Sequence, residues 1–312
     1  MKRYGMACAL ALAAGLGQAA PLAYVANEKS GTVSVIDPAS DRVVGTIGTG
    51  GRPRAVAVGT DGATLYVSAQ SAGALLVFDT ARRQLRERIP LGEAATGIGL
   101  TADGRQLAVV AALANGVVVV DTAGAHARWS VRTAGRKPEH AVFSPDGRWL
   151  YVSAGEGAQV DVIDVAQKKQ VAAIPVARRP RGIAFTSDSR TAYVACELDS
   201  QLFVIDARRH QVLAAVPAGP SANGVTILPD DSKVYVASGR GARIDVFDPA
   251  LRRFTGSIAV GQQPRHMAVT PDGRKLYVAN GGSGTVSVID TRTDQRLGDI
   301  PVGDAPGDVA IH

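Results

Sequence analysis

Short apolar runs separated by turn residues fill nearly the whole chain. The clearest example is residues 271–290, with the sequence PDGRKLYVANGGSGTVSVID. In this stretch an Asp-Gly turn precedes a short strand at residues 276–278, and a Gly-rich turn precedes a second strand at residues 285–289. Asp-Gly between apolar runs is a strong hairpin signal, because glycine accepts the positive φ that a tight turn requires. The pattern therefore predicts a β-hairpin.

Degenerate copies of this hairpin recur along the chain with an interval of 42 or 43 residues. A tyrosine in the first strand keeps the same rhythm, except that Ala108 replaces it in the third copy. A period of about 40 to 50 residues with several short strands in each repeat is typical of a β-propeller. The acid that ends the second strand recurs as Asp37, Asp79, Asp121, Asp164, Asp206, Asp248 and Asp290.

Each repeat contains four short apolar runs and leaves no room for helices. Several runs are apolar on both faces, such as residues 116–120, which predicts sheets covered on each side, as in stacked blades. The hairpin turn occurs six times, and the missing seventh falls where the chain begins and ends. We therefore expect residues 308–311 to form the innermost strand of the blade whose other three strands lie in residues 22–47. The prediction is an all-β fold, a seven-bladed β-propeller of four-stranded antiparallel blades, closed by an exchange that hides a strand edge.

Residues 1–19 predict a cleaved export signal. Two basic residues precede an apolar run at residues 6–16, and small residues stand at positions −3 and −1 of a cleavage point after Ala19. The run is too short to span a membrane, and no later stretch approaches the required length of about 20 apolar residues. We expect residues 20–312 to form one propeller domain that is periplasmic or secreted.

The composition argues against a nucleic-acid partner. Loss of two basic residues with the signal lowers the formal charge from +6 to +4, which is too small to argue for nucleic acid. The aromatic residues of the mature chain lie in or beside predicted strands, so no stacking platform for bases remains. We expect no nucleic-acid partner, no membrane span and a monomer.

The repeat resembles the YVTN-type β-propeller repeat over the whole mature chain. Residues 23–27 (AYVAN) and 276–280 (LYVAN) match its most typical strand, and residues 31–37 (GTVSVID) and 179–184 (RPRGIA) match its flanking segments. The order of blades is similar to that of exported YVTN propellers associated with alcohol catabolism that depends on pyrroloquinoline quinone (PQQ). The resemblance implies export and architecture rather than a reaction, and it is the only reason to consider PQQ as a cofactor. Vicinal cysteines and a repeated Trp motif are absent, so we do not expect the quinone enzyme itself.

Polar residues gather in one register, seven or six positions before each hairpin acid, where the chain enters an innermost strand. The loops that lead into these strands converge on the central funnel of a propeller, where ligands usually bind. Structural positions stay alike between repeats, whereas these positions vary. The pattern predicts a ligand-binding ring formed by Arg54, Glu139, His140, Arg181, Asn223, Arg265, His266 and Asp308.

The ring has three chemical interpretations. Its arginines would form a cationic funnel for carboxylate or phosphate, because guanidinium binds such groups bidentately. Alternatively, each arginine is part of the repeat's own loop chemistry and pairs with a neighbouring blade. His140 and His266, about opposite each other, would bind a metal together with Glu139, since three N or O ligands suffice for an open site.

The leading hypothesis is a non-enzymatic exported binding protein or scaffold. Its funnel would bind a small anionic molecule, a cofactor or a periplasmic protein. The alternative is a propeller enzyme, such as a lactone hydrolase or a metal-assisted lyase, with Glu139, His140 and His266 as metal ligands or general bases. A purely structural scaffold is the third hypothesis, because no P-loop or Gly-x-Ser-x-Gly nucleophile motif occurs.

Three other features are interpreted as structural. Each acid that ends a second strand is expected to cap a turn through its own side chain. Basic pairs such as Arg82-Arg83 follow these acids on the rim opposite the funnel, and solvated turns are favoured over a docking ring for an acidic partner. Cys196, the only cysteine after the signal, is interpreted as a small buried residue rather than a reactive thiol.

Overall fold

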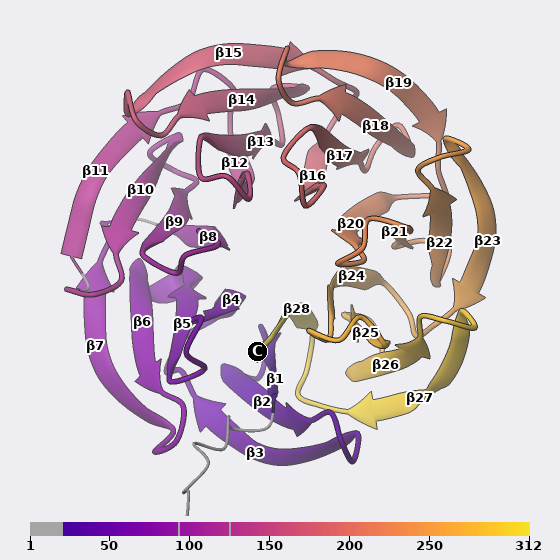
Figure 1. The fold of residues 1–312 in the computed structure, drawn as a ribbon. Coiled ribbons are helices and arrows are strands. Elements are labelled where there is room, and N and C mark those ends of the chain that lie inside the picture. The colour runs from indigo at the N-terminus through magenta and orange to yellow at the C-terminus, as the bar shows by residue number, and fades with distance from the viewer. Residues whose placement is uncertain (1–20, 93, 125) are drawn as a thin grey trace, which may run out of the picture.

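The computed structural model describes residues 21–92, 94–124 and 126–312, so the expected export signal lies outside the described residues. The described chain forms seven four-stranded antiparallel sheets around a central axis (Figure 1). The predicted seven-bladed propeller is confirmed. Within the described ranges, no helix is long and apolar enough to cross a membrane.

The blades follow one another in chain order, and their strands are given from the axis outward. Blade 1 contains β28 (Pro306–Ile311), β1 (Ala23–Asn27), β2 (Thr32–Asp37) and β3 (Arg42–Gly48). Blade 2 contains β4 (Pro53–Val58), β5 (Thr64–Ala69), β6 (Ala74–Asp79) and β7 (Gln84–Pro90), with the single 3-10 turn η1 (Gln70–Ala72) between β5 and β6. Blade 3 contains β8 (Ala95–Leu100), β9 (Gln106–Ala111), β10 (Gly116–Asp121) and β11 (His126–Arg132).

The remaining four blades repeat this arrangement. Blade 4 contains β12 (Pro138–Phe143), β13 (Trp149–Ala154), β14 (Gln159–Asp164) and β15 (Lys169–Pro175). Blade 5 contains β16 (Pro180–Phe185), β17 (Thr191–Cys196), β18 (Gln201–Asp206) and β19 (Gln211–Pro217). Blade 6 contains β20 (Ala222–Ile227), β21 (Val234–Ser238), β22 (Arg243–Asp248) and β23 (Arg253–Ala259). Blade 7 contains β24 (Pro264–Val269), β25 (Lys275–Asn280), β26 (Thr285–Asp290) and β27 (Gln295–Pro301).

The ring closes in blade 1, where the last strand of the chain pairs with the first. β28 runs antiparallel to β1, with Val309 opposite Val25. Two backbone hydrogen bonds between Leu22 and His312, of 2.9 and 3.2 Å, extend the pairing. The C-terminal strand is therefore the innermost strand of the first blade, as the missing hairpin turn predicted.

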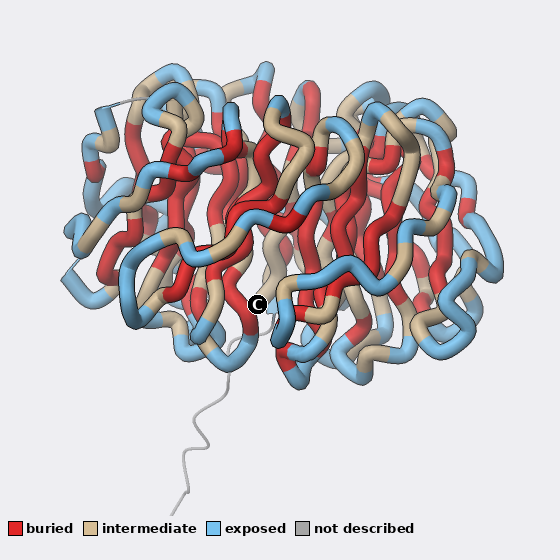
Figure 2. The backbone as a smooth tube through the Cα atoms, turned by 90° about the horizontal axis from the view of Figure 1, so that it is seen from above, coloured by how far each residue is buried: buried red, intermediate tan, exposed pale blue. Residues whose placement is uncertain are grey.

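The hydrophobic core lies between adjacent blades. Middle strands such as β1 are buried at every residue, whereas outermost strands such as β7 are buried only at Ile89 (Figure 2). Tyr151 of blade 4 packs against Phe185 of blade 5, with ring centroids 4.7 Å apart. Burying an aliphatic or aromatic side chain contributes about 1.5–3 kcal/mol, so these layers hold the ring together and fix the height of the innermost strands.

The turns on the rim opposite the funnel follow the predicted chemistry. Gly62 and Gly273 adopt φ of 68° and 72°, and Ser189 and Asp231 adopt positive φ in the variant turns. The acids that end the third strands of the blades accept hydrogen bonds from backbone N–H groups two or three residues later, which confirms their capping role. These acids are Asp37, Asp79, Asp121, Asp164, Asp206, Asp248 and Asp290.

Candidate functional site

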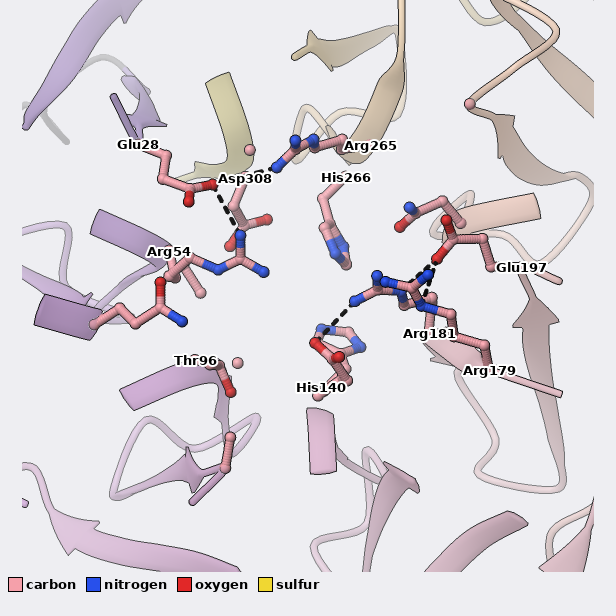
Figure 3. A pocket seen from close by; sticks show the side chains of 18 of the residues that line it. Glu28, Arg54, Thr96, His140, Arg179, Arg181, Glu197, Arg265, His266 and Asp308 are labelled. Atoms are coloured by element: carbon pink, nitrogen blue, oxygen red, sulfur yellow. Dashed lines mark hydrogen bonds and ion pairs between the residues drawn. The ribbon is translucent and has the colours of Figure 1, made fainter. Parts of the chain in front are cut away.

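All eight ring residues predicted from the sequence line one cavity of about 1020 Å³ on the propeller axis. Each is the second or third residue of an innermost strand, which begins with Pro or Ala and enters from the funnel rim. Figure 3 shows most of their side chains gathered around the same space. They are Arg54 in β4, Glu139 and His140 in β12, Arg181 in β16, Asn223 in β20, Arg265 and His266 in β24, and Asp308 in β28.

Glycines bring the innermost strands together at this level. A Cβ atom at Gly97 would lie 2.5 Å from the carbonyl oxygen of Glu139, and one at Gly224 would lie 2.1 Å from that of Arg265. These contacts are with backbone, which cannot move without displacing a strand. Glycine therefore permits the close approach of β8 to β12 and of β20 to β24, and the neighbouring strands supply the polar side chains.

A first cluster of charges surrounds Glu28, which follows β1. Its carboxylate forms ion pairs with Arg52, with Nη1 of Arg54 at 2.8 Å and with Nη1 of Arg265 at 3.3 Å. Burial opposes ionisation of Glu28, but the guanidinium groups outweigh burial and lower the pKa of its carboxyl. Three cations thus share one carboxylate, and with Asp308 ionised beside Arg54 a formal surplus of one positive charge remains. The partners come from blades 1, 2 and 7, so these arginines do pair with neighbouring blades.

A second cluster surrounds Arg181, across the funnel (Figure 3). Nη1 of Arg181 lies 2.8 Å from Oε2 of Glu139, and its Nε lies 2.7 Å from Oε2 of Glu197. Arg179 also contacts Glu197, at 3.2 Å. Two cations and two carboxylates balance here. The ring of three equivalent arginines expected from the sequence is therefore replaced by one cluster with surplus positive charge and one that is neutral.

Glu28 and Glu197, which pair with the arginines, were not among the residues predicted from the sequence. Both occupy the first position after a second strand, and the corresponding positions in other blades include Gln70, Ala112 and Gly155. Both residues stand four positions after the tyrosine that recurs in the repeat, so counting forward from that tyrosine identifies the register. Its two carboxylates stand among neutral residues, and this contrast is the signal that would have found them.

The glycines in this second register explain where two ring side chains lie. A Cβ at Gly281 would fall 2.7 Å from Nε of Arg265, and a Cβ at Gly155 would fall 2.8 Å from Cγ of Glu139. In both blades the ring side chain lies over the glycine. A larger residue there would displace Arg265 or Glu139 from its ion pair.

His140 and His266 meet near the axis, with ring centroids 5.1 Å apart and an angle of 50° between their planes. Their strands belong to blades 4 and 7, as expected for residues that face each other. Burial lowers the pKa of His140 to about 4. Burial, His140 and the nearby arginines lower the pKa of His266 well below its ordinary value. Both imidazoles are therefore neutral at pH 7.

Glu139 does not join the two histidines as a metal ligand, because its carboxylate pairs with Arg181. Over residues 21–92, 94–124 and 126–312, no group of three His, Cys, Asp or Glu side chains is arranged to hold a metal. The described geometry does not bring Glu139, His140 and His266 together as a set of three metal ligands. The ion pair with Arg181 is the physical reason.

Asp308 and Thr96 complete the polar wall. Oδ2 of Asp308 accepts a hydrogen bond of 3.0 Å from the backbone N–H of Val56, which ties β28 to β4. Burial raises the pKa of Asp308 to about 6, although hydrogen bonds from the backbone N–H groups of Val56 and Val309 and the charge of Arg54 act in the opposite direction. Thr96 is only 6% exposed, and its Oγ1 has no hydrogen-bond partner among the described residues.

Cys196 ends β17 and is fully buried in the core between blades 4 and 5. Burial raises the pKa of its thiol to about 12, so the thiolate is scarce at neutral pH. Cys196 does not line the axial cavity. The interpretation of this cysteine as a small buried residue is confirmed.

The seven blades form a closed ring around a polar axial cavity, which defines this protein as a seven-bladed β-propeller. The chain belongs to the YNCE-like β-propeller family, whose model matches residues 43–233. A second model, described as a lactonase seven-bladed β-propeller, matches residues 167–301. Among curated protein sequences, none is significantly similar to this chain.

Solved structures share the fold at low sequence identity. Hydrazine synthase from Kuenenia stuttgartiensis is 22% identical, with a TM-score of 0.78 over 87% of this chain and 92% of that chain. A functionally unknown protein from Desulfotomaculum acetoxidans DSM 771 is 16% identical, with a TM-score of 0.83 over 93% of this chain and 98% of that chain. At such identities the similarity establishes the architecture alone.

Proposed function

We propose that this protein is an exported binding protein that holds a small anionic molecule in its funnel. The observation on which the proposal rests is the cluster around Glu28, where Arg52, Arg54 and Arg265 share a single carboxylate. Export is inferred from the signal-like pattern of residues 1–19. The ligand would enter the cavity from the rim that Glu28 occupies.

The charge surplus favours an anion for a physical reason. The side chains of Arg54 and Arg265 are only 26% and 32% exposed, so water screens them incompletely. Two opposite unit charges about 4 Å apart near a protein surface attract each other by about 4 kcal/mol. A carboxylate or phosphate placed between these guanidiniums would also accept charge-assisted hydrogen bonds, in the geometry that arginine provides.

Titration calorimetry at low ionic strength tests the proposal. The probes are cyclohexanecarboxylate, citrate, inorganic phosphate and PQQ, which is itself a polycarboxylate. We expect at least one probe to bind, and Arg54→Gln with Arg265→Gln to weaken its binding about 100-fold, as loss of two charge-assisted hydrogen bonds implies. The matched control is Arg82→Gln with Arg274→Gln, which removes the same charge from side chains that are 74% and 85% exposed on the other rim.

The control variant is expected to bind like the wild type, because its changes lie far from the cavity. Absence of binding for every probe would refute the proposal. Equal affinities of the funnel variant and the control variant would also refute it, since binding would then not depend on the cluster around Glu28.

Lactone hydrolysis is a second candidate function. It is favoured by the lactonase model that matches residues 167–301 and by the two neutral imidazoles in the cavity, since a neutral imidazole can act as a general base. The test is hydrolysis of a panel of γ- and δ-lactones. Turnover by the wild type that falls at least tenfold in His266→Gln would support this function, and a rate equal to the buffer blank would exclude it for that panel.

A further inference from the structure

Two side chains in the funnel have a buried polar atom with no partner. Among the residues that the structure describes, none forms a hydrogen bond with Oγ1 of Thr96 or Nδ1 of His140, and both residues line the axial cavity. Thr96 is only 6% exposed, so bulk water does not satisfy its hydroxyl. Because buried polar atoms in proteins nearly always have a partner, such a pair in one cavity indicates a partner that a ligand supplies.

Both residues lie beside the cationic cluster. Thr96 is the second residue of β8, in the register that Arg54 occupies in β4 of the preceding blade. His140 belongs to β12 of the next blade. The cavity wall therefore runs from Arg265 past Asp308 to Arg54, and then through Thr96 to His140, as Figure 3 shows.

The chemistry of the neutral part differs from that of the cationic part. A threonine hydroxyl both donates and accepts hydrogen bonds, and a neutral imidazole has one nitrogen of each kind. These properties match a ligand hydroxyl, which also donates and accepts, better than a second carboxylate, which only accepts. The next cation along the wall, Arg181, is already held by Glu139 and Glu197.

We infer that the ligand of the funnel is a hydroxylated monocarboxylate. Its carboxylate binds Arg54 and Arg265, and its hydroxyl groups bind Thr96 and His140. In the described structure Oγ1 of Thr96 and Nδ1 of His140 each expose less than 1 Å². The inference therefore includes a rotation of both side chains toward the ligand when it binds. This inference rests on the proposed anion-binding function and specifies the class of anion.

Paired probes separate the two claims. Quinate and cyclohexanecarboxylate share a ring and a carboxylate, but only quinate has hydroxyl groups. Titration calorimetry of the wild type is expected to give an affinity about tenfold higher for quinate, the effect of satisfying a buried hydroxyl. Thr96→Val keeps the shape of the side chain and removes the hydroxyl, so it is expected to abolish this difference while leaving the affinity for cyclohexanecarboxylate unchanged.

Two features of the variants keep the test interpretable. The Thr96 hydroxyl has no partner in the described part of the chain, so Thr96→Val is expected to fold with undiminished stability, checked by thermal melting. Thr64→Val, at the start of β5 on the other rim, is the matched control and should retain the preference for quinate. Equal affinities for the two probes in the wild type, or an equal loss for both in Thr96→Val, would overturn the inference and leave anion binding intact. Failure of both probes to bind would overturn the inference, and failure of citrate, phosphate and PQQ as well would overturn the proposed function.

Discussion

Gly224 sets the positions of Arg265 and His266, two polar residues in the neighbouring innermost strand. A Cβ atom there would lie 2.1 Å from the carbonyl oxygen of Arg265 and 3.0 Å from Cα of His266. Both atoms belong to the backbone of β24, so relief of the clash requires the strand to move. Glycine at this position therefore sets the height at which Arg265 and His266 enter the funnel.

Gly224→Ala is expected to destabilise the protein by about 2–3 kcal/mol, the usual cost of overpacking a rigid core. Gly256→Ala is the matched control, because an added Cβ there meets no atom within 4 Å. The control is expected to be neutral or slightly stabilising, since alanine loses less backbone entropy than glycine on folding. Urea denaturation of both variants measures the difference. Equal free energies of unfolding for the two variants would contradict this account of the strand contact.

Asp308 predicts a pH dependence of stability. Burial raises the pKa of its carboxyl from 3.8 to about 6, so the folded protein holds this proton more tightly than the unfolded chain. The stabilisation from this proton is complete below pH 3.8 and is lost as the pH rises through 6. By linkage, ionisation costs up to about 3 kcal/mol at neutral pH.

Asp308→Asn removes this ionisation and keeps an oxygen that accepts the hydrogen bond from Val56. The stability of the variant relative to the wild type is expected to improve by about 2–3 kcal/mol between pH 4 and pH 7.5. Urea denaturation at the two pH values provides the measurement. A difference that does not change with pH would show that Asp308 titrates normally.

At the scale of strands and turns, blade 7 contacts blade 1 through the same kinds of side-chain interaction that link blade 6 to blade 7. Tyr277 donates its hydroxyl hydrogen bond to Asp41, and Lys275 Nζ lies 2.7 Å from the same carboxylate. Between blades 6 and 7, Tyr235 and Lys233 make the corresponding contacts to Asp294, at 2.8 and 2.7 Å. The closing interface is therefore built like an ordinary one, and only the strand exchange distinguishes it.

Removal of β28 is expected to prevent cooperative folding. Deletion of residues 304–312 takes Val309 and Ile311 out of the core that blades 1 and 7 share, and it leaves β1 as an unpaired edge. We expect the truncated protein to associate or to lose its cooperative thermal transition. Differential scanning calorimetry combined with light scattering measures both effects.

A circular permutant is the control for this deletion. It begins at Asp304, joins His312 to Leu22 through a short Asn-Gly linker and ends at Gly303, so that blade 1 becomes continuous. Leu22 and His312 already pair through their backbones, so the new turn should form without strain. The permutant is expected to melt within a few degrees of the wild type. A cooperative truncated protein, or a permutant that fails to fold, would contradict the role assigned to β28.

For the whole molecule, the architecture could be predicted because similar strands recur in seven repeats and the hairpin turn recurs in six of them. Asp272 and Gly273 identify one hairpin, and the copies at regular intervals identify the ring. The same periodicity predicted the cavity lining, since residues in equal registers of a closed ring must surround the axis. Arg54 and Arg265 were found in this way.

The pairing of charges could not be predicted from that count. Arg265 and Glu28 are 237 residues apart and meet only because β28 closes the ring between their blades. Arg181 has the same register as Arg54, yet two carboxylates balance it, one in strand β12 and one in the turn after β17. Which arginine retains surplus charge depends on contacts between blades, and these depend on side-chain reach rather than on spacing along the chain.

The resulting funnel is unequal around its axis. Positive surplus gathers near Glu28, neutral polar groups follow at Thr96 and His140, and a balanced cluster surrounds Arg181 (Figure 3). A symmetric ring of arginines would attract any anion without orientation. The ligand that we propose would bind the unequal ring in one orientation, with its carboxylate at the cationic end and its hydroxyl groups at the neutral end.

Native mass spectrometry tests the central claim most directly. The wild type and the Arg54→Gln, Arg265→Gln variant are produced with residues 1–19 in place, purified from the periplasm in a volatile buffer and measured intact. We predict that the wild type retains a small molecule, which is released on activation and detected as an anion, and that the variant lacks it. Identical masses for both proteins after correction for the two substitutions, with no released anion, would contradict a funnel that binds anions.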